Sequence, residues 1–364
     1  MNTECVAHFL VSQTGNDMEV SKKPLRILIT RLSAIGDTVL TLPVLTTLRN
    51  AIPDAFIAWA VESPANQFLE LHPDLDEVIR IPKSWYKKPS NWLEMRKRLQ
   101  TYRFDVSIDP QGITKSAMLG WLSGAPKRIG IQGKWGREIT PWLNNHLVST
   151  QSPHIVKRSV ELLSAIHIDQ VDLEALKFDL PPCSKSCDSV AQKLDEIGIG
   201  QHYCMINPGG GWPSRQWEME RWGSVASYVY RHHHLKSLIV WAGPKERQMA
   251  ERIHNFDPSA SLISPATSLL ELAVVAQRSQ FVLSGDTGPL HIASAMGTPC
   301  IGLYGSTNPQ ESGAYGQNHI EIQKWHQTGS RKTADNDAMR DIMAADVFMA
   351  CDQMVSRMSK QKVA

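Results

Sequence analysis

Short apolar runs alternate with segments of helical periodicity along most of this chain, and this alternation constrains the fold more than any other feature. Four runs lie in the first half, at 25–30, 56–61, 77–81 and 105–109. Four more lie in the second half, at 203–207, 237–241, 281–283 and 300–304. Strands that alternate with helices form parallel sheets with helices on both faces. The sequence therefore predicts an α/β protein with two open, doubly wound parallel sheets.

A break in this alternation at Leu180-Pro181-Pro182 predicts a linker between two domains. The 364 residues are enough for two domains, each with its own hydrophobic core. We expect a flexible extension at 1–23, an N-terminal domain at 24–180, a C-terminal domain at 183–335 and a final helix within 336–364. Open α/β sheets bind ligands beyond the carboxyl ends of their strands, so we expect a ligand in the cleft between the two domains.

The composition excludes several classes of protein. Apolar residues make up 42% of the chain, charged residues 20%, and the net charge is only +2, which excludes nucleic-acid binding driven by gross basicity. No apolar run reaches the roughly 18 residues that a membrane span needs. Residues 1–23 lack the basic and apolar regions of a signal peptide. The six cysteines are scattered, which predicts a reduced, metal-free protein of the cytoplasm.

The motif at 284–295, Ser-Gly-Asp-Thr-Gly-Pro-Leu-His-Ile-Ala-Ser-Ala, directly follows the apolar run at 281–283. A strand that breaks here and opens into a helix leaves the first N–H groups of the helix unpaired. These groups and the positive end of the helix favour an anion such as a diphosphate. Asp286 and His291 add polar side chains beside this position. An ordinary capped helix is the alternative, but the place between two buried strands favours a ligand site.

Two further loops follow strands of the second half. Three successive glycines at 209–211 allow the backbone to approach a ligand closely, and Arg215 is suited to pair with a phosphate. Glu246, after the run at 237–241, is placed to bind ribose hydroxyls, as an acidic residue does in dinucleotide-binding folds. The alternatives are a flexible loop with a solvated arginine and an acid that only begins a helix.

In the first half, Gly36-Asp37 follows the first predicted strand. We expect Asp37 to project from the carboxyl end of that strand and to accept a proton from a substrate hydroxyl, although an N-cap role is the alternative. The stretch at 109–116 ends the fourth strand, and cations follow it on what are expected to be loops. The candidate acceptor ligands, for which simple solvation is the alternative, are Gln111, Lys115, Arg128 and Arg137.

Two other patterns bear on function. The chain lacks Gly-x-Gly-x-x-Gly and Gly-x4-Gly-Lys-Ser/Thr, which argues against dinucleotide oxidoreductases and P-loop NTPases.

The segment at 85–98 mixes aromatic residues with cations, which suggests contact with an anionic membrane surface or a lipid-linked acceptor. A basic helix with a buried stripe at Trp92, Met95 and Leu99 is the alternative.

Taken in order from about 25 to 358, the motifs resemble those of the ADP-heptose:lipopolysaccharide heptosyltransferases, which belong to glycosyltransferase family 9. They are Arg-Leu-Ser-Ala-Ile-Gly-Asp-Thr at 31–38, Asp-Pro-Gln-Gly at 109–112, Gly-Asp-Thr-Gly-Pro-Leu-His at 285–291 and Tyr-Gly-Ser-Thr at 304–307. The resemblance implies a GT-B fold, with two Rossmann-like domains facing a cleft. It also implies that the final helix packs back on the N-terminal domain.

The resemblance further implies an inverting transferase that needs neither metal nor cofactor. The donor would be ADP-L-glycero-D-manno-heptose, and the acceptor the inner core of lipopolysaccharide or a related glycolipid. This implies a cytoplasmic protein, with peripheral contact to the inner membrane and no nucleic-acid partner. Asp37 falls at the family's general base, and the donor-pocket motif falls on Asp286, Thr287, Gly288 and His291. Arg215 and Glu246 fall at the phosphate-binding and ribose-binding positions.

Other functions stay open at this point. Glycines 209–211 replace hydroxylated or acidic residues common in the family, so another nucleotide sugar is a possible donor. A related epimerase would release the nucleotide from the donor alone. A non-catalytic protein that binds nucleotide sugars is the third alternative, against which Asp37, Arg215 and Asp286 argue.

Overall fold

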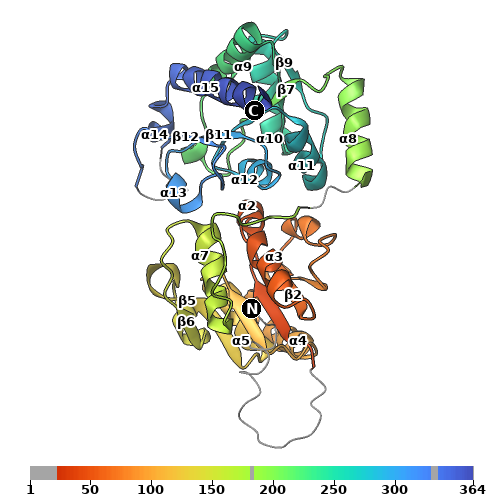
Figure 1. The fold of residues 1–364 in the computed structure, drawn as a ribbon, viewed down its shortest axis with the longest axis vertical. Coiled ribbons are helices and arrows are strands. Elements are labelled where there is room, and N and C mark those ends of the chain that lie inside the picture. The colour runs from red at the N-terminus through yellow and green to blue at the C-terminus, as the bar shows by residue number, and fades with distance from the viewer. Residues whose placement is uncertain (1–22, 181–183, 329–334, 364) are drawn as a thin grey trace, which may run out of the picture. The chain divides into compact units, whose positions relative to one another are not determined.

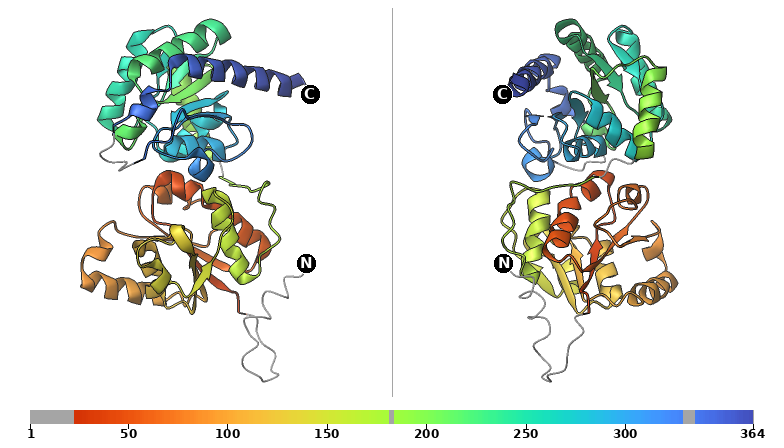
Figure 2. Two further views of the ribbon diagram at one scale, coloured as in Figure 1. Left: turned by 90° about the vertical axis from the view of Figure 1, so that its left-hand side faces the viewer. Right: turned by 45° about the vertical axis from the view of Figure 1, so that its right-hand side comes forward.

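The computed structural model describes residues 23–180, 184–328 and 335–363, the side chains of 361–363 excepted. The predicted extension, apart from Lys23, and most of the predicted linker, with Cys183, lie outside the described residues. The chain divides into two units, Met1–Asp179 and Leu180–Ala364. In each unit, helices cover both faces of a parallel sheet (Figures 1 and 2).

The sheet of the first unit has six parallel strands in the order β3-β2-β1-β4-β5-β6. Successive connections run outward from β1 in one direction and from β4 in the other. The loops that leave these two central strands therefore diverge, which is the usual place of a ligand site in such sheets. The strands are β1 (Arg26–Thr30), β2 (Phe56–Val61), β3 (Glu77–Arg80), β4 (Val106–Asp109), β5 (Lys127–Ile131) and β6 (His146–Val148).

Helices of the first unit follow the predicted pattern, with one correction near its start. The apolar residues at helical spacing in 38–51 predict a single helix, but the structure has two helices here, α2 and α3, separated at Leu40 and Thr41. Pro43 lies in the first turn of α3, where its missing N–H costs nothing, but it cannot continue a helix from before. The helices are α2 (Ile35–Val39), α3 (Leu42–Ala51), α4 (Pro89–Gln100), α5 (Thr114–Ser123), α6 (Thr140–Leu143) and α7 (Ile155–Glu161). Short 3-10 turns lie at η1 (Ala65–Phe68), η2 (Trp85–Lys87), η3 (Gly133–Trp135) and η4 (Leu162–Ile166).

The sheet of the second unit repeats this topology in the order β12-β11-β10-β7-β8-β9. Here β7 and β10 are the central strands from which the connections diverge. The strands are β7 (Tyr203–Asn207), β8 (Lys236–Ile239), β9 (Ser261–Ile263), β10 (Val282–Gly285), β11 (Cys300–Leu303) and β12 (Ile320–Ile322). The helical elements are α8 (Ser184–Glu196), η5 (Pro213–Arg215), α9 (Met219–His233), α10 (Gly243–Phe256), α11 (Leu269–Arg278), α12 (Gly288–Ala295), α13 (Pro309–Ser312), α14 (Asp337–Arg340) and α15 (Ala344–Val363).

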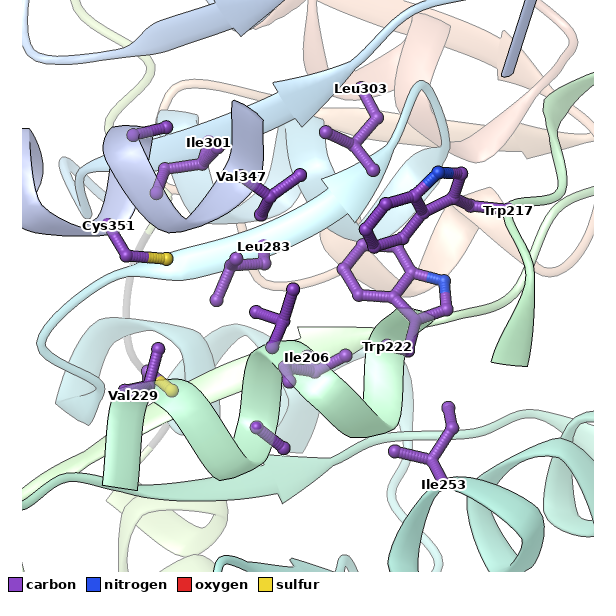
Figure 3. Packing of buried hydrophobic residues seen from close by; sticks show 14 of the residues in the cluster. Ile206, Trp217, Trp222, Val229, Ile253, Leu283, Ile301, Leu303, Val347 and Cys351 are labelled. Carbon is purple, nitrogen blue, oxygen red and sulfur yellow. The ribbon is translucent and has the colours of Figure 1, made fainter. Parts of the chain in front are cut away.

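The predicted final helix is α15, and it belongs to the core of the second unit. Val347 and Cys351 are fully buried and point toward the sheet residues Leu283 and Ile301 (Figure 3). The ring of Phe348 stacks on Tyr228 of α9 at a centroid distance of 4.1 Å. The expected packing of this helix on the N-terminal domain stays a prediction.

Two tryptophans fill the part of this core that lies nearest to the loop after β7. Trp217 and Trp222 meet edge to face, with ring centroids 4.9 Å apart (Figure 3). The Nε1 of Trp217 donates to Ile342 O at 2.9 Å, which fixes the segment before α15.

Of the helices in the described parts of the chain, none is long and apolar enough to cross a membrane.

Replacing Trp217 by Ala removes a nearly buried indole and its hydrogen bond to Ile342. We expect Trp217→Ala to lower the free energy of unfolding by about 3–5 kcal/mol, the usual range for a large aromatic side chain in a core. Trp142→Ala is the control, because that indole is 87% exposed, and its effect should stay within about 0.5 kcal/mol. Urea unfolding followed by circular dichroism measures both, and equal losses would contradict the assignment of Trp217 to the core.

Candidate functional site

At the carboxyl edge of the second sheet, the chain leaves the central strand β10 at Gly285 and begins α12 at Gly288. Thr287 is the extended N-cap residue, and the N–H groups of Leu290 and His291 return to its carbonyl oxygen. The N–H groups of Thr287 and Gly288 precede the hydrogen bonds of the helix, as the first donors of any helix do. The predicted turn from strand to helix is thus confirmed, and the binding of an anion by these donors stays a prediction.

Thr287 is held by side chains from both central strands. The Nδ2 of Asn207, the last residue of β7, donates to Ser284 Oγ and to Thr287 Oγ1, each at 2.9 Å. Asn207 was missed by the sequence analysis, although it stands at the end of a predicted strand. The contact fixes the start of α12 against β7.

Asp286 lies at the centre of the site and is almost completely buried. Its Oδ1 is 3.0 Å from His291 Nε2, and its Oδ2 is 3.5 Å from Arg215 Nη2. Arg215 Nη1 also donates to the carbonyl oxygen of Asp286 at 2.7 Å. Burial disfavours the charged carboxylate, but the hydrogen bond from His291 and the charges of His291 and Arg215 outweigh it and lower the pKa of Asp286. The structure brings these three predicted residues together as one buried charged cluster.

Two nitrogen atoms of this cluster, His291 Nδ1 and Arg215 Nε, are buried and without a hydrogen-bond partner among the described residues. An unpaired buried polar group costs about 1–3 kcal/mol, so proteins rarely leave one without a partner. Together with the start of α12, these atoms suit a ligand that carries several acceptor oxygens, such as a diphosphate.

The glycines after β7 bring Arg215 and Glu246 close to this edge. A Cβ at Gly209 would lie 2.4 Å from Glu246 Oε1, so only glycine allows this carboxylate its present place. A Cβ at Gly285 would lie 3.0 Å from Arg215 O, which shows how closely the loop crosses the end of β10.

Glu246 lies in the first turn of α10 and accepts from Ala242 N at 2.8 Å. Burial raises the pKa of this carboxyl, with the hydrogen bond from Ala242 opposing the shift. One carboxylate oxygen of Glu246, Oε2, therefore accepts from the N–H before the helix, as the alternative of a helix-initiating acid predicts. Its other oxygen lies beside Gly209, on the side predicted for the ligand.

Asp37 lies in the first turn of α2, at the carboxyl edge of the first sheet, and its side chain is 43% exposed. Ala34 N donates to Asp37 Oδ2 at 3.2 Å, and Arg31 Nη2 lies 3.1 Å from the same oxygen. The N-cap residue of α2 is Ala34, so Asp37 is not the N-cap; it caps the helix from the third helical position, where its carboxylate accepts from the N–H of Ala34. In the part of the chain that is described, both of these contacts end on Oδ2, and the predicted role of Asp37 as a base stays a prediction.

Gln111 lies beside Asp37 but uses its amide within the protein. Its Oε1 accepts from Leu32 N at 2.8 Å, and its Nε2 donates to Ser33 O at 2.9 Å. Asp109 supports the same turn by accepting from the N–H groups of Gln111 and Gly112, and burial raises the pKa of its carboxyl. Gln111 thus connects the loop before Asp37 to the end of β4. Its contact with an acceptor stays a prediction, and this geometry does not favour it because both ends of the amide already bind the backbone.

The three predicted acceptor cations have different surroundings. Lys115 pairs with the buried Glu62 at 2.7 Å and lies 4.8 Å from the ring centroid of Tyr86. Arg137 is exposed, and its N–H donates to Gly112 O. Glu62 was missed, although it directly follows a predicted strand.

Arg128 is separated from this group. Residues 127–131 form β5, not the expected loop, because they pair in parallel with β4. Arg128 lies in the amino-terminal half of that strand, opposite Ser107, and its guanidinium donates to Leu143 O and Ala125 O. These contacts give Arg128 a structural role away from the Asp37 edge.

Within the described segments, no group of three or more His, Cys, Asp or Glu side chains is placed to hold a metal ion. The sequence-based expectation of a reaction without metal or cofactor stays a prediction.

Comparison with known proteins places the chain in context. The family model of glycosyltransferase family 9 (heptosyltransferase) matches residues 92–342. Lipopolysaccharide heptosyltransferase 1 of Salmonella typhimurium is 29% identical over 309 residues, covering 81% of this chain and 93% of that protein.

Two solved structures share the fold. A family 9 glycosyl transferase from Veillonella parvula superposes with a TM-score of 0.76 and 21% identity, over 92% of this chain and 97% of that one. The heptosyltransferase WaaC of E. coli with ADP-2-deoxy-2-fluoro heptose gives a TM-score of 0.72 and 24% identity, over 90% and 99%. These likenesses confirm the expected GT-B class with two Rossmann-like domains.

Arg215→Met should weaken binding of a nucleoside diphosphate, because it removes the cation beside the start of α12. Hydrogen bonds to charged groups contribute about 1.5–3 kcal/mol, so we expect the Kd of ADP to rise roughly 10- to 100-fold. Arg252→Met is the control, since Arg252 is an exposed arginine that pairs with Glu220 on the surface. Titration calorimetry measures both variants, and an unchanged Kd in Arg215→Met would exclude Arg215 from the ligand site.

Proposed function

Because the chain belongs to glycosyltransferase family 9, it is a glycosyltransferase, and we propose that it transfers a heptose. The proposed donor is ADP-L-glycero-D-manno-heptose, and the proposed acceptor is the inner core of lipopolysaccharide or a related glycolipid. The name of the Salmonella relative supports lipopolysaccharide as the acceptor, and the name of the E. coli structure supports an ADP-linked heptose as the donor. The observation that carries the proposal is the buried Asp286–His291–Arg215 cluster at the start of α12.

In this proposal the second unit binds the donor. The N–H groups of Thr287 and Gly288, with Arg215, receive the diphosphate, and Glu246 receives the ribose hydroxyls. As the bond between the anomeric carbon and the diphosphate oxygen breaks, negative charge grows on the departing ADP. Fixed donors already aimed at that charge stabilise the transition state more than the ground state.

The first unit provides the base. An acceptor hydroxyl attacks the anomeric carbon from the face opposite the diphosphate, and its proton passes to Asp37 Oδ1. A single displacement of this kind inverts the anomeric configuration. Since Arg215 and the N–H groups supply positive potential at the leaving group, we propose that the transfer is independent of metal.

The test is an assay with ADP-heptose and a purified inner-core acceptor that lacks heptose, with and without EDTA. The proposal expects ADP release that depends on the acceptor, a product of inverted configuration by NMR, and no effect of EDTA. Turnover with only a UDP or GDP sugar would replace the donor. Release of nucleotide from the donor alone would favour the epimerase, and loss of activity in EDTA would overturn the metal-independent step.

Asp37→Ala removes the proposed base and changes no residue of the second unit. We expect turnover to fall at least about a hundredfold, the usual scale of general base catalysis, while the Kd of ADP stays nearly unchanged. Asp54→Ala, an exposed acid of the same unit, is the control and should keep its activity. Near-normal turnover of Asp37→Ala would refute the assignment of Asp37.

We also propose that α4 contacts the anionic surface in which a glycolipid acceptor resides. Met95 and Leu99 form the buried stripe of this helix, whereas Trp92 is 37% and Leu93 64% exposed. The exposed charged side chains of 85–98 are five cations and one acid, Glu94, and basic segments with exposed aromatic residues bind anionic lipid surfaces. The five cations are Lys87 of η2, Lys88 before α4, and Arg96, Lys97 and Arg98 of α4.

Flotation with vesicles tests this contact. We expect binding to vesicles that contain phosphatidylglycerol and little binding to pure phosphatidylcholine. The double variant Lys88→Glu/Lys97→Glu should weaken binding, since each cation near such a surface contributes about 1 kcal/mol. Lys185→Glu/Lys360→Glu makes the same change of charge in the second unit and is the control. Equal binding to both kinds of vesicle would exclude the electrostatic contact.

A further inference from the structure

Arg31 is a buried cation at the end of β1 to which the reaction described above gives no part. Its side chain is only 4% exposed. The guanidinium connects two loops: Nη1 donates to Pro110 O at 3.0 Å, and Nη2 lies 3.1 Å from Asp37 Oδ2. Its own carbonyl oxygen accepts from the indole of Trp59 at 3.1 Å, so both the backbone and the side chain of Arg31 are fixed.

A buried guanidinium is costly as a purely structural bridge. Removing a charge from water costs several kcal/mol, and a half-exposed carboxylate returns little of that energy, because water screens the pair. A neutral side chain could bridge the loops more cheaply. The charge therefore points to a role at Asp37 itself.

The contacts of Asp37 show what that role is. Arg31 Nη2 and Ala34 N approach Oδ2 from two directions, which fixes the plane of the carboxylate. A carboxylate held by one oxygen presents the other in a defined direction. We propose that Arg31 is a positioning residue that aims Asp37 Oδ1 at the acceptor hydroxyl. This inference rests on the proposed function of Asp37 as the base.

The loop itself does not depend on Arg31 alone. Gln111 binds the backbone of Leu32 and of Ser33 with its two amide ends. Glu62 N donates to Leu32 O at 2.9 Å, which adds a bond to the end of β2. Variants of Arg31 should therefore keep the fold of the loop while they release the carboxylate of Asp37.

The experiment is a double-variant cycle on the full-length enzyme. Arg31→Gln and Arg31→Lys are each made in the parent and in the Asp37→Asn background, and kcat, the KM of the donor and the Kd of ADP are measured. We expect Arg31→Gln to lower kcat about 10- to 100-fold, as misplacement of a catalytic group does, with the KM and Kd within about twofold. Arg31→Lys should recover part of this loss, because it keeps the cation. In Asp37→Asn, Arg31→Gln should change kcat by less than about twofold, since residues that act as a unit are not additive.

Arg49→Gln is the matched control, because Arg49 also bridges backbone carbonyl groups and a carboxylate, that of Asp76. It should lower the melting temperature without changing kcat selectively. Equal factors for Arg31→Gln in the two backgrounds, or an unchanged kcat, would overturn the positioning role while leaving Asp37 as the base. Full turnover of Asp37→Asn would overturn both.

Discussion

The parallel pairing of two central strands in each sheet, β1 with β4 and β7 with β10, is the constraint on which both candidate sites depend. Parallel strands end at one edge, and at these pairs the connections leave in opposite directions. Side chains from segments far apart in sequence meet there, as Asn207 meets Thr287 and Arg31 meets Asp37. The topology of each sheet thus determines which side chains meet at its candidate site.

The two edges use charge differently. In the second unit, Asp286 is buried with His291 and Arg215, so its carboxylate lies next to an imidazole and a guanidinium. In the first unit, Asp37 stays half-exposed, and only its partner Arg31 is buried. A buried cluster suits a permanent binding site, whereas an accessible oxygen suits a group that must receive a proton.

Much of the fold followed from local pattern, and the parts that did not have physical reasons. Apolar runs of β-rich residues revealed all four of the central strands. The strand β5, with its two leading cations, and the three-residue strands β6, β9 and β12 gave no comparable signal. Asp286, His291 and Arg215 were found because a strand, a turn and a helix stand next to them in sequence. Glu62 and the bridging use of Gln111 depend on contacts over long sequence separation, and no local pattern encodes these. Arg128 was expected on a loop but lies in β5, because no local sequence pattern distinguishes a cation in a strand from a cation in a loop.

The place of α15 in the second core has a consequence for the order in which the chain acquires its structure. The strands of the first unit all lie within 26–148, so its sheet can close while synthesis continues. The core of the second unit also requires Val347, Cys351 and Met354, which are translated after every strand of its sheet. Domains fold as units on the ribosome, N-terminal first. The nascent second unit therefore leaves the apolar surface around Leu283 and Ile301 without its covering helix until α15 is synthesised.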